Sequence, residues 1–287
     1  MADAVELDAL WDFGDPAGSE DRFRAVVDRA RADGDAILAE ALTQLARAQG
    51  LQRRFDEADR TLDDAEAALR PDDVRARIRL DLERGRVANT AGRPARGAES
   101  FRRAWELAGE ANEDGLAVDA AHMLGIVEPR DDARAWNERA MELARTSDDP
   151  VARRWVGSLA NNMGWARHDA GDDDGAIRLF EVSRDAFLED GRDDRARIAR
   201  WSIGRCLRSR GDLEPALAAQ AELVAELDAL GETDGYVFEE IAECLLALGR
   251  DDEARPLFAR AWEELRVDPS LSVGEPERLE RLRALAG

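Results

Sequence analysis

Two stretches decide how this chain folds: Gly85-Arg-Val-Ala-Asn-Thr-Ala-Gly92 and Gly164-Trp-Ala-Arg-His-Asp-Ala-Gly171. Each begins with a small residue and reaches a glycine seven positions later. A second small residue follows five positions after that glycine, and a bulky residue follows four positions later still. The chain therefore contains an internal repeat. The remaining landmarks of its four regular copies are Gly97 and Phe101, Ala176 and Phe180, Gly204, Gly211 and Ala216, and Ala242, Gly249, Ala254 and Phe258.

Two further copies follow the template more loosely. The second small residue falls at positions 58, 97, 133, 176, 216 and 254 of the six copies, so the period is near 40 residues. The third copy is irregular, because its helix-joining loop at residues 127–132 is shorter by about one turn of helix. Periods of this length are typical of stacked supersecondary units.

The repeated residues predict a helical hairpin in every copy. Each copy offers a first helix with an apolar stripe, a turn at glycine and a second helix. Small residues where the two helices cross allow the backbones to approach closely. One hairpin cannot bury its apolar face alone, whereas stacked neighbours bury a continuous core. We therefore expect an all-α stack of about six hairpins.

This pattern resembles the tetratricopeptide repeat, and the resemblance covers residues 37–268. Most of the small and apolar positions of the family motif are kept in each copy. The family period is about 34 residues, so the chain is similar to a long-period bacterial member. The resemblance implies a right-handed α-solenoid of about six hairpins. The expected repeats are 37–73, 74–113, 114–148, 152–191, 193–230 and 233–268.

Both ends of the chain are expected to cap the stack. Residues 1–36 carry an amphipathic helix from about Ser19 to Asp33, with Trp11 and Phe13 predicted to pack beneath it. Residues 269–287 form a last helix with leucines at positions 279, 282 and 285. Terminal repeats need a polar outer face for solubility, and both segments supply one.

Charge and composition narrow the possible partners. The formal net charge is −22, and all 41 basic residues are arginine. An acidic surface repels phosphate backbones and anionic headgroups, so neither nucleic acid nor membrane is an expected partner. The arginine bias is explained either by a GC-rich genome or by a salt-loving host. The N-terminus resembles no signal peptide and no apolar run would span a bilayer, so we expect a cytoplasmic protein.

No motif for catalysis, metal binding or cofactor binding was recognised, so the chain is predicted to be no enzyme. The glycines fall at repeat positions rather than in a phosphate-binding loop. The run 172–174 of three aspartates lacks the spaced ligands of a calcium loop and is interpreted as a turn and helix cap. Cys206 and Cys244 occupy equivalent template positions in successive repeats. Such positions lie about 10 Å apart, too far for a disulfide, so both are interpreted as buried thiols.

The resemblance places a ligand on the concave face, which the first helix of each hairpin lines. The positions through which the family binds peptides hold both histidines, the only tyrosine, two tryptophans and an asparagine pair. Aromatic residues and arginine are enriched at binding hot spots. The alternative is that Trp165 and Trp201 pack between neighbouring first helices. The predicted binding residues are Arg86, Asn161, Asn162, Trp165, His168, Trp201, Arg205, Arg208 and Glu240.

The favoured function is a scaffold that binds an unidentified protein or peptide. The arginines at 86, 205 and 208 would favour an acidic or carboxylate-bearing ligand, and the glutamates at 239, 240 and 243 a basic segment. Asn162 matches the middle element of the family's clamp for a C-terminal carboxylate, but the flanking elements are absent. Alternatives are a homodimerising structural module and a peptide sensor that lacks its effector domain. An enzyme using His168 beside Asp169 is disfavoured.

Overall fold

The computed structural model describes residues 7–287, apart from the side chains of residues 269 and 270. Residues 1–6, which carry part of the expectation about a signal peptide, lie outside the described residues. The described chain is helical throughout, which confirms the all-α prediction. The contacts divide it into two compact units, Met1–Trp155 and Val156–Gly287. None of the described helices is both long and apolar enough to cross a membrane.

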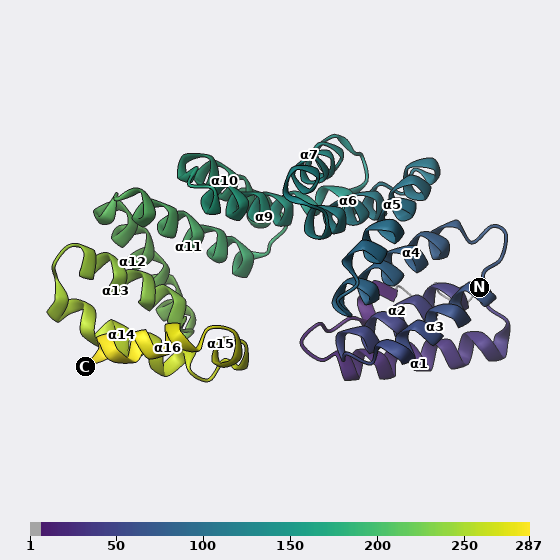
Figure 1. Ribbon diagram of the computed structural model, residues 1–287, viewed down its shortest axis with the longest axis horizontal. Helices are drawn as coiled ribbons and strands as arrows, with labels where there is room; N and C mark the ends of the chain where they lie inside the picture. The colour runs from purple at the N-terminus through teal and green to yellow at the C-terminus, as the bar shows by residue number, and fades with distance from the viewer. Residues whose placement is uncertain (1–6) are drawn as a thin grey trace. The chain divides into compact units, whose positions relative to one another are not determined.

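The N-terminal unit contains a short helix, a capping helix and three hairpins (Figure 1). The capping helix packs against the first helix of the first hairpin, and the first helices of successive hairpins contact one another. The elements are η1 (Leu7–Leu10), α1 (Pro16–Asp33), α2 (Leu38–Leu51), α3 (Phe55–Ala68), α4 (Val74–Thr90), α5 (Pro94–Ala111), α6 (Asp114–Val127), α7 (Arg130–Thr146) and α8 (Pro150–Arg153).

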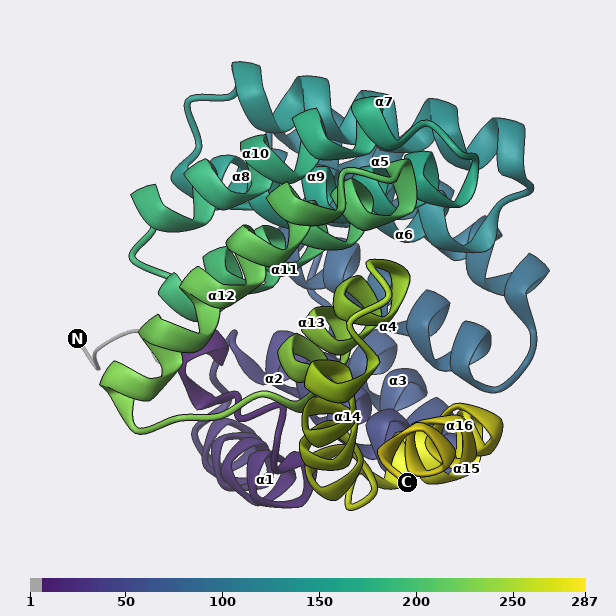
Figure 2. The same ribbon diagram turned by 90° about the vertical axis from the view of Figure 1, so that its left-hand side faces the viewer.

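The C-terminal unit contains three more hairpins and a closing pair of helices. In Figure 2 the last helix lies beside the second helix of the last hairpin, and the two are in contact. That last helix closes the stack by burying Leu282, as the sequence predicted. The elements are α9 (Trp155–Asp169), α10 (Asp173–Glu189), α11 (Asp193–Arg210), α12 (Leu213–Leu230), α13 (Gly235–Ala247), α14 (Asp251–Leu265), α15 (Pro269–Gly274) and α16 (Pro276–Ala286).

Glycine forms the turn inside four of the six hairpins. Gly92, Gly171, Gly211 and Gly249 all have positive φ, between 74° and 91°, a region that costs glycine nothing. The first hairpin instead places Arg53 there, at φ 61°. The irregular third hairpin uses no such turn: α6 ends at Val127, Glu128 is extended, and Pro129 precedes α7. The predicted shortening by about one turn of helix does not fall in the loop alone: the loop has two residues, against two or three in the other hairpins, and residues 130–132 belong to α7.

The small residue of the first helix lets the bulky residue of the second helix approach its backbone. A Cβ atom on Gly85 would lie 2.4 Å from Cε1 of Phe101, and one on Gly164 would lie 2.7 Å from Cε1 of Phe180. Both phenylalanines are fully buried. These close contacts explain why the template pairs a small residue with a bulky one sixteen positions later.

The N-terminal cap differs in one respect from the prediction. Trp11 packs against Phe23 of α1, with ring centroids 4.8 Å apart, and its Nε1 donates a hydrogen bond to Oε1 of Gln44 at 3.0 Å. Phe13 does not pack beneath the helix, because it stacks on the outer side of Trp11 and remains 60% exposed. Of these two aromatic residues, only Trp11 packs against the helix.

Candidate functional site

The predicted binding residues fall in both units. Arg86 belongs to α4 of the N-terminal unit, and its guanidinium is held by carboxylates of that unit. It donates to Oδ2 of Asp119 at 2.6 Å and also pairs with Glu83. Burial opposes its charge, but the two carboxylates outweigh burial and raise the pKa of Arg86 above its ordinary value. Arg86 therefore joins α4 to α6 rather than facing a ligand unpaired.

The other predicted residues lie in the C-terminal unit, where several of them line three of the surface hollows. The first, which we call the apolar hollow, has a volume of about 460 Å³. It is formed where α11 and α12 meet the start of α13, and hydrophobic side chains dominate its lining. Its lining residues are Asp194, Arg197, Ile198, Trp201, Leu223, Leu227, Glu232, Thr233, Asp234, Tyr236 and Val237.

The second hollow, which we call the asparagine hollow, lies between α9 and α11 and measures about 240 Å³. Asn161 and Asn162 both line it, together with Ser158, Phe187, Arg192, Arg195 and Ile198. Asn162 is exposed and Asn161 half-buried. The exposed side chain of Ile198, 44% accessible, borders this hollow and the apolar hollow alike. The two hollows are therefore neighbours along α11.

An aromatic row connects successive first helices of this unit. The ring of Trp165 lies 5.9 Å from that of Trp201, and Trp201 lies 6.0 Å from Tyr236. Nε1 of Trp201 donates to the backbone oxygen of Tyr236 at 3.1 Å. Trp165 also contacts Phe180, at 5.3 Å. Both tryptophans thus pack between first helices, the alternative raised from the sequence, while Trp201 keeps one surface at the apolar hollow.

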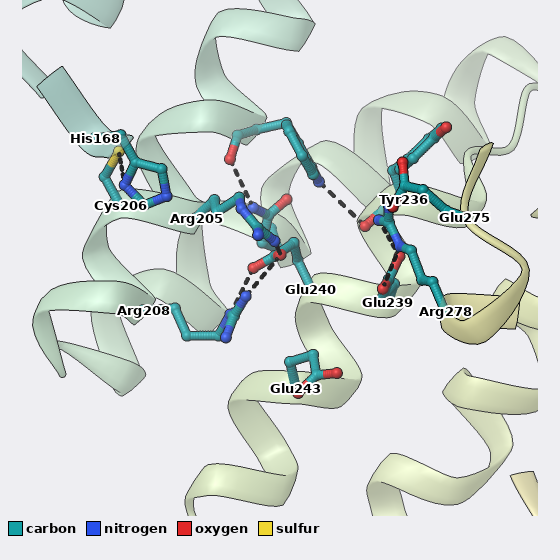
Figure 3. A network of polar contacts seen from close by, with 12 residues as sticks. His168, Arg205, Cys206, Arg208, Tyr236, Glu239, Glu240, Glu243, Glu275 and Arg278 are labelled. Carbon is teal, nitrogen blue, oxygen red and sulfur yellow. Dashed lines mark hydrogen bonds and ion pairs between the residues drawn. The ribbon is translucent and has the colours of Figure 1, made fainter. Parts of the chain in front are cut away.

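The third hollow, which we call the charged hollow, lies between α11, α13 and α16 and is almost wholly polar (Figure 3). Glu240 is 1% exposed and accepts from Nε of Arg208 at 2.7 Å and from Nη1 of Arg205 at 2.5 Å. Glu239 accepts from Nε of Arg278 at 2.9 Å. Glu243 pairs with Arg281.

These pairs correct the predicted electrostatics. The sequence suggested that Arg205 and Arg208 attract an acidic ligand and that the glutamates of α13 attract a basic one. In the structure the two groups satisfy each other across α11 and α13, with α16 completing the set. Asn162 and Arg205, both among the predicted binding residues, do not share a hollow: Asn162 lines the asparagine hollow and Arg205 the charged hollow.

His168 has a different partner from the one considered in the sequence. Its Nδ1 lies 2.6 Å from Oδ1 of Asp173, whereas Asp169 is exposed. Sγ of Cys206 lies 3.6 Å from the same nitrogen. Both cysteines are buried and free, as predicted.

Sequence reasoning missed Ile198 and the two leucines of α12 that floor the apolar hollow. The signal was present in part, because Ile198 precedes Trp201 by three positions and therefore shares its face of a helix. The leucines gave no such signal, because core leucines and hollow-lining leucines on a second helix have the same spacing.

Comparison with known proteins supports the fold. No family model matches the chain, and no curated protein matches it either. Among solved structures, NprR bound to its cognate peptide NprX is similar at TM-score 0.55 and 15% identity, over 97% of this chain and 81% of that one. A Rap protein complexed with Competence and Sporulation Factor gives TM-score 0.52 and 16% identity, over 94% and 87%.

A third solved structure is called a tetratricopeptide repeat protein outright. It comes from Parabacteroides merdae and gives TM-score 0.51 at 18% identity, over 98% of this chain and 96% of that one. Together with the hairpins and their glycine turns, these similarities identify the chain as a TPR-like repeat protein by fold. The resemblance drawn from the repeat template is thus confirmed at the level of fold.

Proposed function

We propose that this chain is a non-catalytic scaffold that binds a protein or peptide along α9, α11 and the start of α13. The observation that carries the proposal is the adjacency of the apolar hollow and the asparagine hollow, which share Ile198. A groove with an apolar recess at one end and side-chain amides at the other suits an extended peptide. Asn side chains offer one acceptor and two donors, which match the backbone of such a ligand.

The lining suggests the kind of side chain that the ligand inserts. A recess of about 460 Å³ floored by Leu223 and Leu227 accommodates a bulky apolar group. Acidic residues outnumber basic ones at its rim, and Arg197 is already paired with Glu226 and Glu232. We therefore expect a large apolar residue with a lysine or arginine beside it.

The proposal uses part of the residue set predicted from the sequence. It places Asn161, Asn162 and Trp201 at the ligand and adds Ile198 and Tyr236. It assigns a connecting role to Arg86, Arg205, Arg208 and Glu240, because their charged groups pair across successive helices. Trp165 and His168 would support the face from beneath.

The raised pKa values of the two cysteine thiols support a non-catalytic role for these residues. Burial, followed by the Asp173 carboxylate, raises the pKa of Cys206 to about 12. Burial, followed by Glu240, raises the pKa of Cys244 to about 11. A thiol reacts as its thiolate, and both are protonated near neutral pH. Neither cysteine is suited to nucleophilic catalysis.

A positional peptide library, read by fluorescence anisotropy, tests the proposal. Selected peptides are expected to carry the apolar–basic pair described above. Ile198→Asp places a charge between the two hollows and should weaken the best peptide by about tenfold or more, a loss of about 1.4 kcal/mol.

Ile126→Asp is the matched control, because Ile126 is an isoleucine of α6 with 54% exposure that lines neither hollow. The Ile126→Asp variant should bind the best peptide with the wild-type affinity. Equal affinities of the Ile198 variant and the wild type would refute the proposal. So would a change of oligomeric state on light scattering without any loss of peptide affinity, since the face would then join two copies of the chain.

A further inference from the structure

Three side chains with metal-ligating atoms meet beneath the aromatic row. His168 lies at the C-terminal end of α9, Asp173 is the first residue of α10, and Cys206 lies on α11. One imidazole nitrogen, one carboxylate oxygen and the sulfur all lie within 4.8 Å of one another. The turn at Gly171 brings the first two together, and the packing of α10 against α11 adds the third.

The nitrogen–sulfur distance matches that around a four-coordinate ion, whereas the nitrogen–oxygen distance is that of a hydrogen bond. Zinc bonds of about 2.0–2.3 Å to nitrogen, oxygen and sulfur require tetrahedral edges of about 3.4 Å between nitrogen and oxygen and about 3.6 Å between nitrogen and sulfur. The observed distance from Nδ1 of His168 to Sγ of Cys206 is 3.6 Å. The distance from that nitrogen to Oδ1 of Asp173 is 2.6 Å. A small rotation of the aspartate side chain would open the shorter edge.

We propose that His168, Asp173 and Cys206 bind a divalent transition-metal ion of the zinc class, with water as the fourth ligand. Sulfur, imidazole and carboxylate together form a borderline-soft set that zinc and cobalt accept, whereas magnesium and calcium prefer oxygen alone. The site is independent of the peptide groove proposed above, because none of its three ligands lines either hollow of that groove.

Burial of the three groups suits this role. Cys206 is fully buried, while the side chains of His168 and Asp173 are 14% and 15% exposed. The ion and its water would therefore enter from the histidine and aspartate side. Binding would form a metal–sulfur bond and release the thiol proton of Cys206 to solvent. The imidazole of His168 would bind the ion through Nδ1 with its proton moved to Nε2, so that coordination replaces the present contact between Nδ1 and Asp173.

A bound ion would connect two hairpins at a point close to the groove. It would tie the α9–α10 turn to α11 through three coordinate bonds. The ring of Trp165 lies edge-on to His168 at 5.4 Å and next to Trp201. The ion would therefore fix the aromatic row from beneath without touching a peptide above it.

Cobalt titration of the chelator-treated full chain provides the test. Co²⁺ bound through a thiolate shows a near-ultraviolet charge-transfer band, and tetrahedral Co²⁺ shows intense visible bands. We expect both bands to saturate at one ion per chain and Zn²⁺ to displace the cobalt. Cys206→Ser should abolish the charge-transfer band, and Asp173→Asn should weaken binding by at least about tenfold.

Cys244→Ser is the matched control. Cys244 is also buried and free, on the next first helix, but it belongs to no such cluster among the described residues. Its variant should retain both bands. Circular dichroism confirms that each variant is folded. The proposal is overturned if the folded wild type shows no thiolate band, if Cys244→Ser removes it, or if Cys206→Ser leaves it unchanged.

Discussion

Arg53 occupies a backbone conformation that glycine holds at the corresponding turns of later hairpins. Its φ is 61°, and no glycine is available at that place in the first copy. A residue with a Cβ in this region costs about 1 kcal/mol relative to glycine. The guanidinium of Arg53 lies 5.9 Å above the ring of Phe55, a contact that only partly offsets the strain.

We predict that Arg53→Gly raises the free energy of unfolding by up to about 0.5 kcal/mol. The reason is relief of the left-handed strain, reduced by the greater entropy of glycine in the unfolded chain. Urea denaturation followed by circular dichroism measures the change. The reciprocal Gly92→Arg is expected to destabilise, and a loss of stability in Arg53→Gly would contradict the strain argument.

His122 is predicted to make stability depend on pH. Burial lowers the pKa of this imidazole from its ordinary value of 6.5, and Asp119 only partly opposes that effect. Its Nδ1 is buried without a hydrogen-bond partner, and its ring packs on Trp155 at 5.1 Å. Because the folded state holds the proton less tightly than the unfolded state, stability falls as the pH drops from 6.5 towards the folded pKa.

The substitution His122→Gln should remove the part of the pH dependence of stability that comes from this imidazole. Denaturation of both proteins between pH 8 and pH 5 is therefore expected to give curves that diverge below about pH 6.5, with the wild type losing more stability. Parallel curves across that range would show that His122 titrates alike in the folded and unfolded chains.

At the scale of elements, one carboxylate serves two helices. Oδ1 of Asp149 accepts from the backbone N–H of Val151 at 2.9 Å, at the start of α8. Its Oδ2 accepts from the N–H of Gly115 at 3.0 Å, in the first turn of α6. Each bond satisfies an N–H that has no partner within its own helix.

We predict that Asp149→Ala lowers the free energy of unfolding by about 2 kcal/mol, since a single cap contributes about 1 kcal/mol. Asp15→Ala, which removes the cap of α1 alone, should cost about half as much. Asp149→Asn keeps one oxygen acceptor and should fall between the alanine variant and the wild type. Equal losses for Asp149→Ala and Asp15→Ala would contradict the double cap.

The elements were largely predictable from the sequence, whereas their side-chain pairing was not. The pairs Gly85 with Phe101 and Gly164 with Phe180 have a short, local spacing that recurs in the regular copies. The pairing of Arg205 with Glu240 joins residues 35 positions apart. This pairing depends on the axial offset between the first helices of successive hairpins. The repeat period varies between copies, so the sequence does not determine that offset. Exposure of Ile198 and the meeting of Cys206 with His168 depend on the same offset.

At the scale of the whole molecule, the described contacts are those between neighbouring helices, in two compact units. In such a stack each hairpin derives its stability from itself and its neighbours. Damage in one unit should therefore be felt mainly in that unit.

Gly164→Ala tests this expectation. The new methyl group would meet Phe180 at 2.7 Å, and overpacking of this kind costs about 1–3 kcal/mol. Hydrogen exchange should accelerate within residues 156–287 and change little within residues 7–155. Gly109→Ala is the control, because its Cβ would meet nothing within 4 Å. Uniform acceleration along the chain would show that the molecule unfolds as one cooperative block.

The arginine–carboxylate pairs between successive helices bear on how such a chain evolves. The pairs of Arg86 with Asp119 and of Arg205 with Glu240 each match the first helix of one hairpin to the first helix of the next. The pair of Arg278 with Glu239 matches the closing helix α16 to α13. Duplication or deletion of a copy would place a helix against a different neighbour. Like charges would then face each other, or a buried charge would lose its partner. Internal duplication of a repeat would therefore destabilise the fold. Point mutations that remove these charge pairs would have to come before any change in the number of hairpins.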